Sequence, residues 1–222
     1  MGSDQAMNFS VIDMETWDRK EYFQHYYHAV RCTYSVTVNM DISKIYGRVK
    51  ECGFRLYPTL IWWIARAVNH FPFLRFHHDE EGRVGYYDTV HPSFTYMPPQ
   101  SDKFHVLWCR YDDRFPRFHD RCVEVMDRFD TSKMFPMQDM PRNCFDISAV
   151  PWIEFGAVNL NVFSEGTHLP PIFTTGKLIK EGGKVKLPVC LQVHHSVCDG
   201  YHAGQCFSYL EELAEDPSAW ML

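Results

Sequence analysis

The most chemically dense part of the sequence is a run near the C-terminus with three histidines, a cysteine and an aspartate. His194, His195, Cys198, Asp199 and His202 lie within nine residues, directly after a predicted β-strand. Adjacent side chains of a strand point to opposite faces, so only one of the first two imidazoles can enter a given site. A neutral imidazole can take the proton from a hydroxyl or thiol as that group attacks an acyl carbon. The run is therefore a candidate for general-base catalysis.

Two other interpretations of this run are open from the residue types alone. The two adjacent histidines could be surface residues at a strand end, followed by an Asp-Gly turn. The run could also bind zinc, because it contains acceptable donors, namely His194, His195, Cys198, Asp199, His202 and Cys206. None of their spacings matches a zinc finger or ribbon, which disfavours the metal interpretation.

The heptapeptide HHSVCDG at residues 194–200 resembles the HHxxxDG signature of coenzyme-A-dependent acyltransferases. That signature alone also admits dihydrolipoyl acyltransferases, carnitine acyltransferases and condensation domains. Five further motifs have the order and spacing of the classical chloramphenicol acetyltransferases: WDRKEYF at 17–23, YPTLI at 57–61, FDISAVPW at 145–152, FGAVNLN at 155–161 and PIFTTGK at 171–177. The chain is thus similar to that family from about Phe9 to Leu213.

The resemblance implies a role for each residue of the catalytic apparatus. It implies that His195 is the general base that deprotonates an acceptor hydroxyl, without a covalent acyl-enzyme. It implies that the Ser148 hydroxyl hydrogen-bonds the tetrahedral oxyanion, which can contribute a few kcal/mol at the transition state. Asp199 lies four residues after His195 and suggests a Ser-His-Asp triad. The resemblance instead pairs Asp199 with Arg19 in a buried ion pair that supports the geometry of the site.

The resemblance also assigns an acceptor pocket that is mainly apolar and aromatic, as a chlorinated aromatic amide requires. The residues at these positions are Tyr26, Val30, Cys32, Phe104, Phe135, Leu160, Val162, Ile172 and Thr174. The chain departs from the family pattern where Asn, Phe and Tyr are common, because it has Asp146, Val158 and His168 there, and His25 replaces an aromatic residue. These departures leave the acyl-transfer residues unchanged and leave the identity of the acceptor open.

The elements that must position these residues follow from hydrophobic periodicity and turn signals. Strands are predicted at 33–41, 85–88, 93–97, 158–162, 172–178 and 186–193, with a glycine hairpin turn at 181–184. Helices are predicted at 17–23 with Thr16 as N-cap, at 59–69, at 115–128 and at 201–213. The helix at 59–69 is apolar on most sides and should be buried. The pattern predicts an α/β or α+β two-layer sandwich, with helices flanking a mixed sheet, and the resemblance implies the coenzyme-A-dependent acyltransferase fold.

Composition limits the class of protein. The 222 residues are 45% hydrophobic with a net charge of −6, which argues against a disordered chain and against an electrostatic nucleic-acid binder. No apolar run approaches the ~18 residues of a membrane span, and no secretory signal is visible. The eight cysteines form no CxxC pair, so we expect a reduced, cytoplasmic protein. Residues 1–6 are interpreted as an expression leader and residues 7–222 as one acyltransferase domain.

With the resemblance, these observations predict an enzyme that acetylates and inactivates chloramphenicol, with acetyl-CoA as co-substrate and no metal. The resemblance implies a homotrimer in which His195 of one subunit meets the acceptor pocket of its neighbour. No nucleic-acid or membrane partner is expected. One alternative is the same acetyl transfer to another small alcohol. The other is a non-enzymatic protein that binds a metal through the His/Cys cluster or sequesters a drug.

Overall fold

A seven-stranded mixed sheet forms the body of the protein. The structure is a computed structural model, which describes residues 8–99, 101–130, 140–162 and 166–222. The strands are β2 (Thr33–Asp41), β5 (His91–Tyr96), β6 (His105–Trp108), β7 (Cys144–Ala149), β8 (Ile172–Thr175), β9 (Ile179–Glu181) and β10 (Lys184–His194). Their order is β2–β10–β8–β7–β5–β6, and β9 pairs with the start of β10. Strand β7 runs parallel to β5 and β8, whereas the other neighbours are antiparallel.

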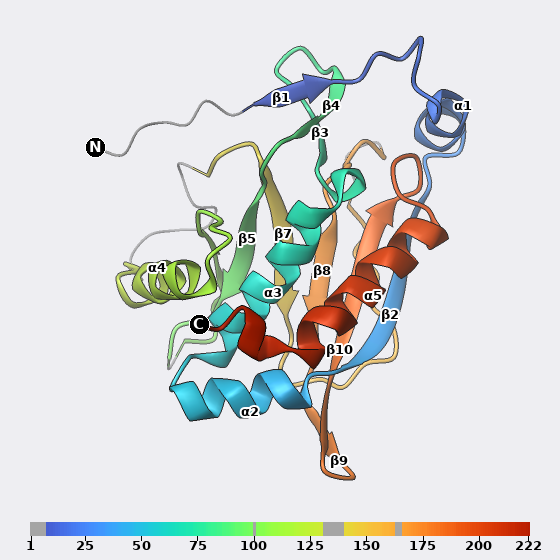
Figure 1. The fold of residues 1–222 in the computed structure, drawn as a ribbon. Helices are drawn as coiled ribbons and strands as arrows, with labels where there is room; N and C mark the ends of the chain where they lie inside the picture. Colours follow the sequence, from blue (N-terminus) through green and yellow to red (C-terminus); the bar gives the residue numbers. More distant parts are fainter. Residues whose placement is uncertain (1–7, 100, 131–139, 163–165) are drawn as a thin grey trace.

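Helices cover one face of this sheet (Figure 1). They are α2 (Ser43–Cys52), α3 (Leu56–His70), α4 (Phe115–Asp127) and α5 (Gly200–Glu215), with short 3-10 turns η2 (Pro72–Leu74) and η3 (Pro217–Ala219). In Figure 1, α3 and α5 lie in front of the central strands, and α2 crosses near their lower ends. The sequence predicts this two-layer arrangement of helices on a mixed sheet, and the prediction is confirmed.

A smaller, three-stranded sheet and a short helical segment complete the fold. The small sheet has the order β1–β4–β3 and contains β1 (Phe9–Val11), β3 (Phe76–His78) and β4 (Val84–Tyr87). Helix α1 (Lys20–Phe23) continues without a break into a π-helix, η1 (Gln24–Ala29), which leads into β2. None of the helices in the described ranges is long and apolar enough to cross a membrane.

The predicted buried helix is α3, and it holds the helical layer to the sheet. Ile61, Trp63 and Ile64 are completely buried within it. The Trp63 indole Nε1 donates to the Leu210 carbonyl of α5 at 3.0 Å, and Trp62 Nε1 donates to the Asp112 carbonyl at 2.9 Å. The polar atom of each large apolar ring is therefore satisfied. The two indoles connect α3 to α5 and to the loop before α4.

The strand predicted at 158–162 is wrong, because this segment is irregular. The side-chain amide of Gln192 accepts from the Leu160 N–H and donates to the Leu160 carbonyl, both at 2.7 Å. The Cys190 thiol donates to the Val158 carbonyl at 3.2 Å. Buried backbone groups need hydrogen-bond partners, and here side chains of β10 supply the partners that an adjacent strand would have supplied.

The predicted start of the first helix is also wrong. Thr16 does not cap a helix, because its hydroxyl donates to Asp13 Oδ2 at 3.0 Å, and residues 14–19 form turns before α1 begins at Lys20. Asp13 also accepts the Glu15 N–H at 3.0 Å, an arrangement by which an aspartate holds a turn. The glycine hairpin is confirmed, since Gly182 and Gly183 have φ of 57° and 77° between β9 and β10.

Replacing Trp63 by Ala should lower the free energy of unfolding by about 3–5 kcal/mol, because a fully buried indole leaves a cavity. The measurement is urea unfolding followed by circular dichroism. Tyr201→Ala is the matched control, since that ring is 74% exposed, and it should change the value by less than about 0.5 kcal/mol. A loss at Trp63 no larger than that of the control would contradict the anchoring role of α3.

Candidate active site

The end of β10 determines where the predicted catalytic histidine lies. β10 pairs with β2 through nine residue pairs, and the last pair joins His194 to Thr33. The chain then turns, because the N–H groups of Val197 and Cys198 both donate to the His194 carbonyl at 3.2 Å. The N–H of His195 donates to the Cys32 carbonyl at 2.9 Å. The backbone of His195 is thus fixed to the segment that begins β2.

His194 is a buried structural residue, with only 1% of its surface exposed. Its Nε2 lies 2.8 Å from the Gly166 carbonyl, and its Nδ1 lies 2.7 Å from Ser196 Oγ and 3.2 Å from Ser196 N. Because a carbonyl only accepts, Nε2 carries the proton and Nδ1 is the acceptor. Burial lowers the pKa of His194, which keeps the ring neutral at neutral pH. Both ring nitrogens are therefore occupied.

The imidazole of His195 lies against two tyrosine rings. Tyr26 of η1 stacks on it, with the ring centroids 4.0 Å apart and the planes 7° from parallel. Tyr34 of β2 approaches with its centroid at 5.1 Å and its plane at 56°. Nδ1 is buried without a hydrogen-bond partner among the described residues. The stack fixes the plane of the ring, and Nε2 is the nitrogen that remains to reach a substrate.

Asp199 begins α5 and connects it to the N-terminal segment. Its Oδ1 accepts the N–H groups of Tyr201 at 3.1 Å and His202 at 3.2 Å, which caps the helix. Its Oδ2 accepts from Arg19 Nη1 at 3.1 Å, so the ion pair implied by the resemblance is present. Burial alone would raise the pKa of Asp199, but the His202 N–H and the Arg19 guanidinium outweigh it and the pKa is lowered. The two side chains are 22% and 31% exposed, so the pair is only partly buried.

The carboxylate oxygens of Asp199 are thus occupied by Arg19 and by the first turn of α5. Within the described part of the chain, no hydrogen bond joins Asp199 to His195. A Ser-His-Asp triad would need the aspartate on the histidine Nδ1, and here that atom has no partner. The triad interpretation is therefore inconsistent with the geometry of this chain.

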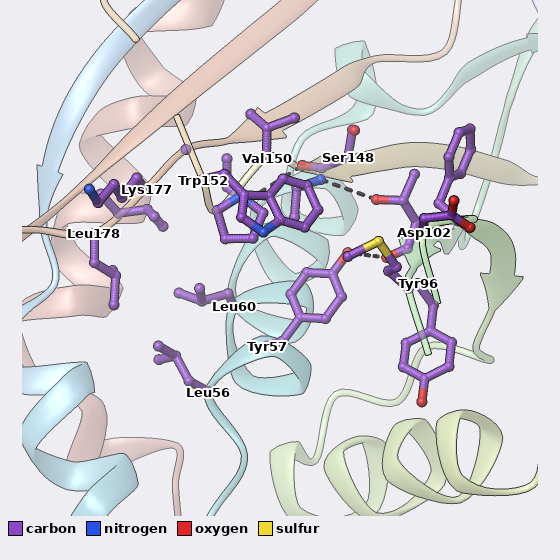
Figure 2. A pocket seen from close by; sticks show the side chains of 18 of the residues that line it. Leu56, Tyr57, Leu60, Tyr96, Asp102, Ser148, Val150, Trp152, Lys177 and Leu178 are labelled. Carbon is purple, nitrogen blue, oxygen red and sulfur yellow. Dashed lines mark hydrogen bonds between the residues drawn. The ribbon is translucent and has the colours of Figure 1, made fainter. Parts of the chain in front are cut away.

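Ser148 lies on β7, on the sheet face away from the helices. Its neighbour Ile147 is 2% exposed and belongs to the core, so alternation directs Ser148 to the other face. Figure 2 shows its hydroxyl pointing away from Leu56 and Leu60 of α3. Ser148 also borders a cavity of about 1070 Å³, whose walls include Tyr57, Tyr96, Val150, Trp152, Lys177 and Leu178. Its hydroxyl points away from the part of this cavity that Leu56 and Leu60 line (Figure 2). No side-chain hydrogen bond of Ser148 occurs among the described residues.

Ser148 and His195 of one chain lie far apart. Ser148 pairs with Thr174 of β8, Thr174 pairs with Cys190 of β10, and His195 follows five residues later. With about 3.3 Å per residue along a strand and about 4.8 Å between strands, the separation is roughly 19 Å. A single chain therefore does not bring the two predicted catalytic residues into one site.

The predicted acceptor-pocket residues are distributed over three regions. The segment from η1 to β2 that holds His195 contains Tyr26, Val30 and Cys32. The face of β8 away from the helices carries Ile172 and Thr174, which are 7% and 5% exposed, and the segment held by Gln192 carries Leu160 and Val162. Phe104 lies at the Ser148 cavity, and Phe135 lies outside the described residues. Four of these residues are exposed: Val30 by 52%, Phe104 by 57%, Leu160 by 42% and Val162 by 43%.

Two positions at which the chain departs from the family pattern face one another. The Nε2 atom of His168 lies 4.0 Å from Asp146 Oδ2. Burial raises the pKa of Asp146 and lowers that of His168. Asp146 lies two residues before Ser148 on the same strand, so the two side chains share a face. The third departure, Val158, lies on the irregular segment beside Cys190.

Comparison with known proteins identifies the family. The sequence matches the family model described as chloramphenicol acetyltransferase over residues 7–211. A chloramphenicol acetyltransferase of Clostridium perfringens is 41% identical over 216 residues, which cover 97% of this chain and 99% of that protein. One of Bacillus pumilus is 42% identical over 214 residues, which cover 96% of each chain. The chain belongs to the chloramphenicol acetyltransferase family. It is therefore an acyltransferase enzyme.

The fold of this acetyltransferase is shared with solved structures. A solved chloramphenicol acetyltransferase superposes with a TM-score of 0.83 at 23% identity, covering 93% of this chain and 100% of that one. A dihydrolipoamide acetyltransferase of Azotobacter vinelandii superposes with a TM-score of 0.65 at 18% identity, covering 86% and 84%. The acyltransferase fold expected from the resemblance is thus confirmed.

The His/Cys run of this acetyltransferase is not arranged to chelate a metal ion. No group of three or more His, Cys, Asp or Glu side chains in the described ranges could hold one. His194 uses both ring nitrogens in hydrogen bonds. Burial raises the pKa of the Cys198 thiol to about 12, so without a metal ion this group is a neutral thiol at neutral pH. The donor geometry gives no support to the metal-binding alternative.

Two residues of this acetyltransferase contribute to the site without having been predicted. Tyr34 reaches His195 because it is paired with Val193 across β2 and β10, which no local pattern reveals. The His202 ring accepts the Asp199 N–H at 3.2 Å and completes a capping box. The spacing of Asp199 and His202 was a usable signal, because capping boxes join the N-cap to the third residue of the helix.

Substitutions at Asp199 and Arg19 should separate the helix cap from the ion pair. Both Asp199→Asn and Asp199→Ala remove the ion pair, but asparagine can still cap the helix. Asp199→Ala should therefore lower the free energy of unfolding by about 1 kcal/mol more than Asp199→Asn does. Arg19→Gln removes only the ion pair and should cost about 1–3 kcal/mol, since partial exposure lies between the surface and buried cases. Urea unfolding measures all three, and equal losses at Asp199→Asn and Asp199→Ala would contradict the capping role.

Proposed function

We propose that this enzyme transfers the acetyl group of acetyl-CoA to the primary hydroxyl of chloramphenicol and so inactivates the antibiotic. The observation that carries the proposal is family membership over residues 7–211, with relatives 41% and 42% identical that bear the name of this activity. Conferring resistance to the antibiotic follows from this chemistry. Transfer is direct, in a complex that contains both substrates.

In the proposed reaction His195 is the general base. Its Nε2 takes the proton of the acceptor hydroxyl as that oxygen attacks the thioester carbon. The C–S bond of the tetrahedral intermediate then breaks, and the imidazolium returns the proton to the sulfur of coenzyme A. For Nε2 to accept a proton, Nδ1 must carry the other hydrogen. The stack on Tyr26 and the backbone bond to Cys32 support this role by fixing the ring.

Ser148 is proposed to stabilise the oxyanion of the tetrahedral intermediate. Its hydroxyl has no competing hydrogen bond among the described residues, so it is free to donate to a developing negative charge. A donor aimed at the oxyanion lowers the barrier by about 3–4 kcal/mol in well-studied enzymes. Asp199 and Arg19 are proposed to support the turn that carries His195, without touching substrate.

We infer that the working unit is a homotrimer with each active site between two subunits. His195 and Ser148 of one chain are too far apart to act on one substrate. In a cyclic assembly, His195 of one subunit can face Ser148 of the next, because such interfaces join two different surfaces. Exposed apolar side chains lie on both surfaces, for example Val30 on the surface of His195 and Phe104 on the surface of Ser148. Their exposure supports the inference that a neighbouring subunit covers them. The acceptor would then bind between the two surfaces.

The donor acetyl-CoA is proposed to occupy the cavity beside Ser148. The cavity has a volume of about 1070 Å³, and its walls are largely apolar, as the pantetheine chain requires. Lys177 and Lys180 line the same cavity and could neutralise the phosphates of coenzyme A. In Figure 2, Lys177 lies at the side of the cavity away from Asp102. The thioester would lie near Ser148 and the phosphates near the lysines.

A second acceptor, another small alcohol, is favoured by one observation. Asp146 and His168 introduce an ionisable pair beside Ser148, whereas chloramphenicol is uncharged.

The compartment of the reaction is proposed to be the cytoplasm, because all eight cysteines are free, as in a reducing environment.

Replacing His195 by Ala should abolish chloramphenicol-dependent release of coenzyme A thiol, because the general base is lost. We expect a fall in turnover of at least about 100-fold. His70→Ala is the matched control, since His70 is an exposed histidine at the end of α3, and it should retain full turnover. Unchanged turnover in the His195 variant would contradict the mechanism, and thiol release that ignores chloramphenicol would contradict the acceptor.

Replacing Ser148 by Ala should lower kcat by about 100-fold and leave KM nearly unchanged, because the oxyanion exists only along the reaction path. Steady-state kinetics with acetyl-CoA and chloramphenicol measure both constants. A change confined to KM would assign Ser148 to substrate binding and contradict the oxyanion role.

Coexpression of His195→Ala and Ser148→Ala chains should restore activity that neither variant has alone. In a trimer whose sites lie between subunits, about a quarter of the interfaces of a random equal mixture carry both wild-type residues. Two variants purified separately and mixed without dissociation serve as the control. Failure of coexpressed, demonstrably mixed trimers to exceed that control would contradict the shared site.

A further inference from the structure

Asp146 lies beside the proposed reaction centre on the open face of the sheet. It pairs with Ile172 of β8 and with Ser93 of β5, and it precedes Ser148 by two residues on β7. Residues two apart on a strand project from the same face about 7 Å from one another. The Asp146 side chain is 48% exposed. A carboxylate is therefore available to a molecule that binds against Ser148.

His168 faces Asp146 but does not satisfy it. The 4.0 Å between Nε2 and Oδ2 exceeds a hydrogen bond, and His168 Nε2 is buried without a hydrogen-bond partner among the described residues. The loop that carries His168 is held in place, because His194 Nε2 donates to the Gly166 carbonyl at 2.8 Å. The pair is thus a fixed imidazole beside a carboxylate whose side chain is 48% exposed.

Among the described residues, no Lys or Arg side chain forms an ion pair with Asp146. Burial lowers the pKa values of His168, of His77 and His78 on β3, and of His194 on β10, so these rings are neutral. Within the described part of the chain, the only ion pair of Asp146 is the one with His168. On β5 the facing group is the Ser93 side chain, whose hydrogen bond lowers the pKa of Asp146 against the larger effect of burial. When Asp146 is ionised, its negative charge is therefore not offset by a cationic side chain of the described residues.

We propose that Asp146, which faces His168, makes the acceptor site selective for alcohols that carry a positive charge near the acetylated hydroxyl. The proposal rests on the proposed acetyl transfer and specifies the class of acceptor that this chain favours, an amino alcohol. A cation beside Asp146 gains Coulomb attraction, whereas a neutral acceptor leaves the carboxylate without a counter-charge.

The same carboxylate affects the chemical step. The oxyanion that forms at Ser148 is repelled by a negative charge about 7 Å away. A cationic acceptor offsets this repulsion, since its charge lies between the carboxylate and the reacting centre. A neutral acceptor has no such compensation, so the penalty appears in its turnover. Asp146 thus favours a cationic acceptor over a neutral one both in substrate binding and in the transition state.

The test compares two acceptors that differ in charge. Chloramphenicol is a neutral amide, and its deacylated form, 2-amino-1-(4-nitrophenyl)propane-1,3-diol, is a primary amine with the same diol and ring. For each acceptor, kcat/KM is measured from coenzyme A thiol release, and NMR of the product shows whether the acetyl group is on oxygen or on nitrogen. For each enzyme, kcat/KM for the amine is divided by kcat/KM for the amide, and this ratio is compared between wild type and Asp146→Asn. The comparison cancels the contribution of the dichloroacetyl group, because that contribution is the same in both enzymes.

We expect Asp146→Asn to lower the amine-to-amide ratio about tenfold, with a loss on the amine and a gain in kcat on chloramphenicol. Asp120→Asn makes the same charge change at a side chain that is 82% exposed on α4, and it should leave the ratio unchanged. In wild type, raising salt to about 1 M should lower the ratio in the same direction, because an accessible carboxylate is screened. This second measurement does not depend on the folding of a variant.

An unchanged ratio in Asp146→Asn, an equal change for both acceptors, or a ratio insensitive to salt would overturn the proposal. Equilibrium dialysis of the two acceptors against wild type and Asp146→Asn gives the same ratio from dissociation constants, without turnover. If neither acceptor supports thiol release in wild type, the proposed function fails. The ratio of the two dissociation constants then still decides whether Asp146 selects a cationic acceptor. Failure of the proposed acetyl transfer is therefore distinguishable from failure of the proposed selectivity.

Discussion

The pairing of β10 with β2 is the constraint on which the rest of the site depends. Nine residue pairs hold the two strands in register, and the ladder ends where His194 meets Thr33. A shift by one residue would exchange the faces of every side chain on β10, so His194 would leave its hydrogen bonds to Gly166 and Ser196. Such a shift would also remove the Gln192 amide from Leu160 and expose the apolar side of the strand. The register is therefore specified by the core on one face and by polar side chains on the other. The position of His195 is a consequence of this register, because its backbone is bonded to Cys32 directly beyond the ladder.

The polar groups around this turn have distinct tasks that follow from their hydrogen bonds. His194 is a neutral ring with both nitrogens occupied, so it can hold structure but cannot exchange protons with a substrate. Asp199 is an ionised group with both oxygens occupied by Arg19 and by α5, so it fixes the turn and does not act on the imidazole. Of His194, His195 and Asp199, the imidazole of His195 is the group that combines a fixed ring plane with a nitrogen unpaired among the described residues. Two adjacent histidines of the same type thus differ in function because one lies inside the hydrogen-bonded network and the other lies at its border.

Much of the fold could be predicted from the sequence, because local periodicity reports burial. Alternation predicts β2 over its full length, the apolar run predicts α3, and two glycines predict the turn before β10. The segment 158–162 alternates equally well, but its partners are side chains of Gln192 and Cys190, which lie some thirty residues away and have no local signature. The π-helix η1 and the approach of Tyr34 to His195 also depend on tertiary contacts. Motifs and the family resemblance predict the site residues and their distribution over two subunits, whereas the residue types and their spacing alone predict neither. Sequence order does not state whether two motif residues meet within one chain or between chains.

The division of the site has a physical consequence for what the enzyme can recognise. A chain whose His195 and Ser148 are roughly 19 Å apart leaves each half with an exposed apolar border. In the proposed trimer, covering that border would contribute to both assembly and substrate binding. Apolar burial is not directional, so these borders favour many hydrophobic acceptors almost equally. Discrimination among them must come from polar groups that are fixed on one half. On the Ser148 half, Asp146 and His168 are such groups, because the strand and the Gly166 bond determine their positions. On the proposed role of Asp146, selectivity can therefore change at this position without any change in the acyl-transfer residues, since the carboxylate would act through its charge and not through the reacting atoms.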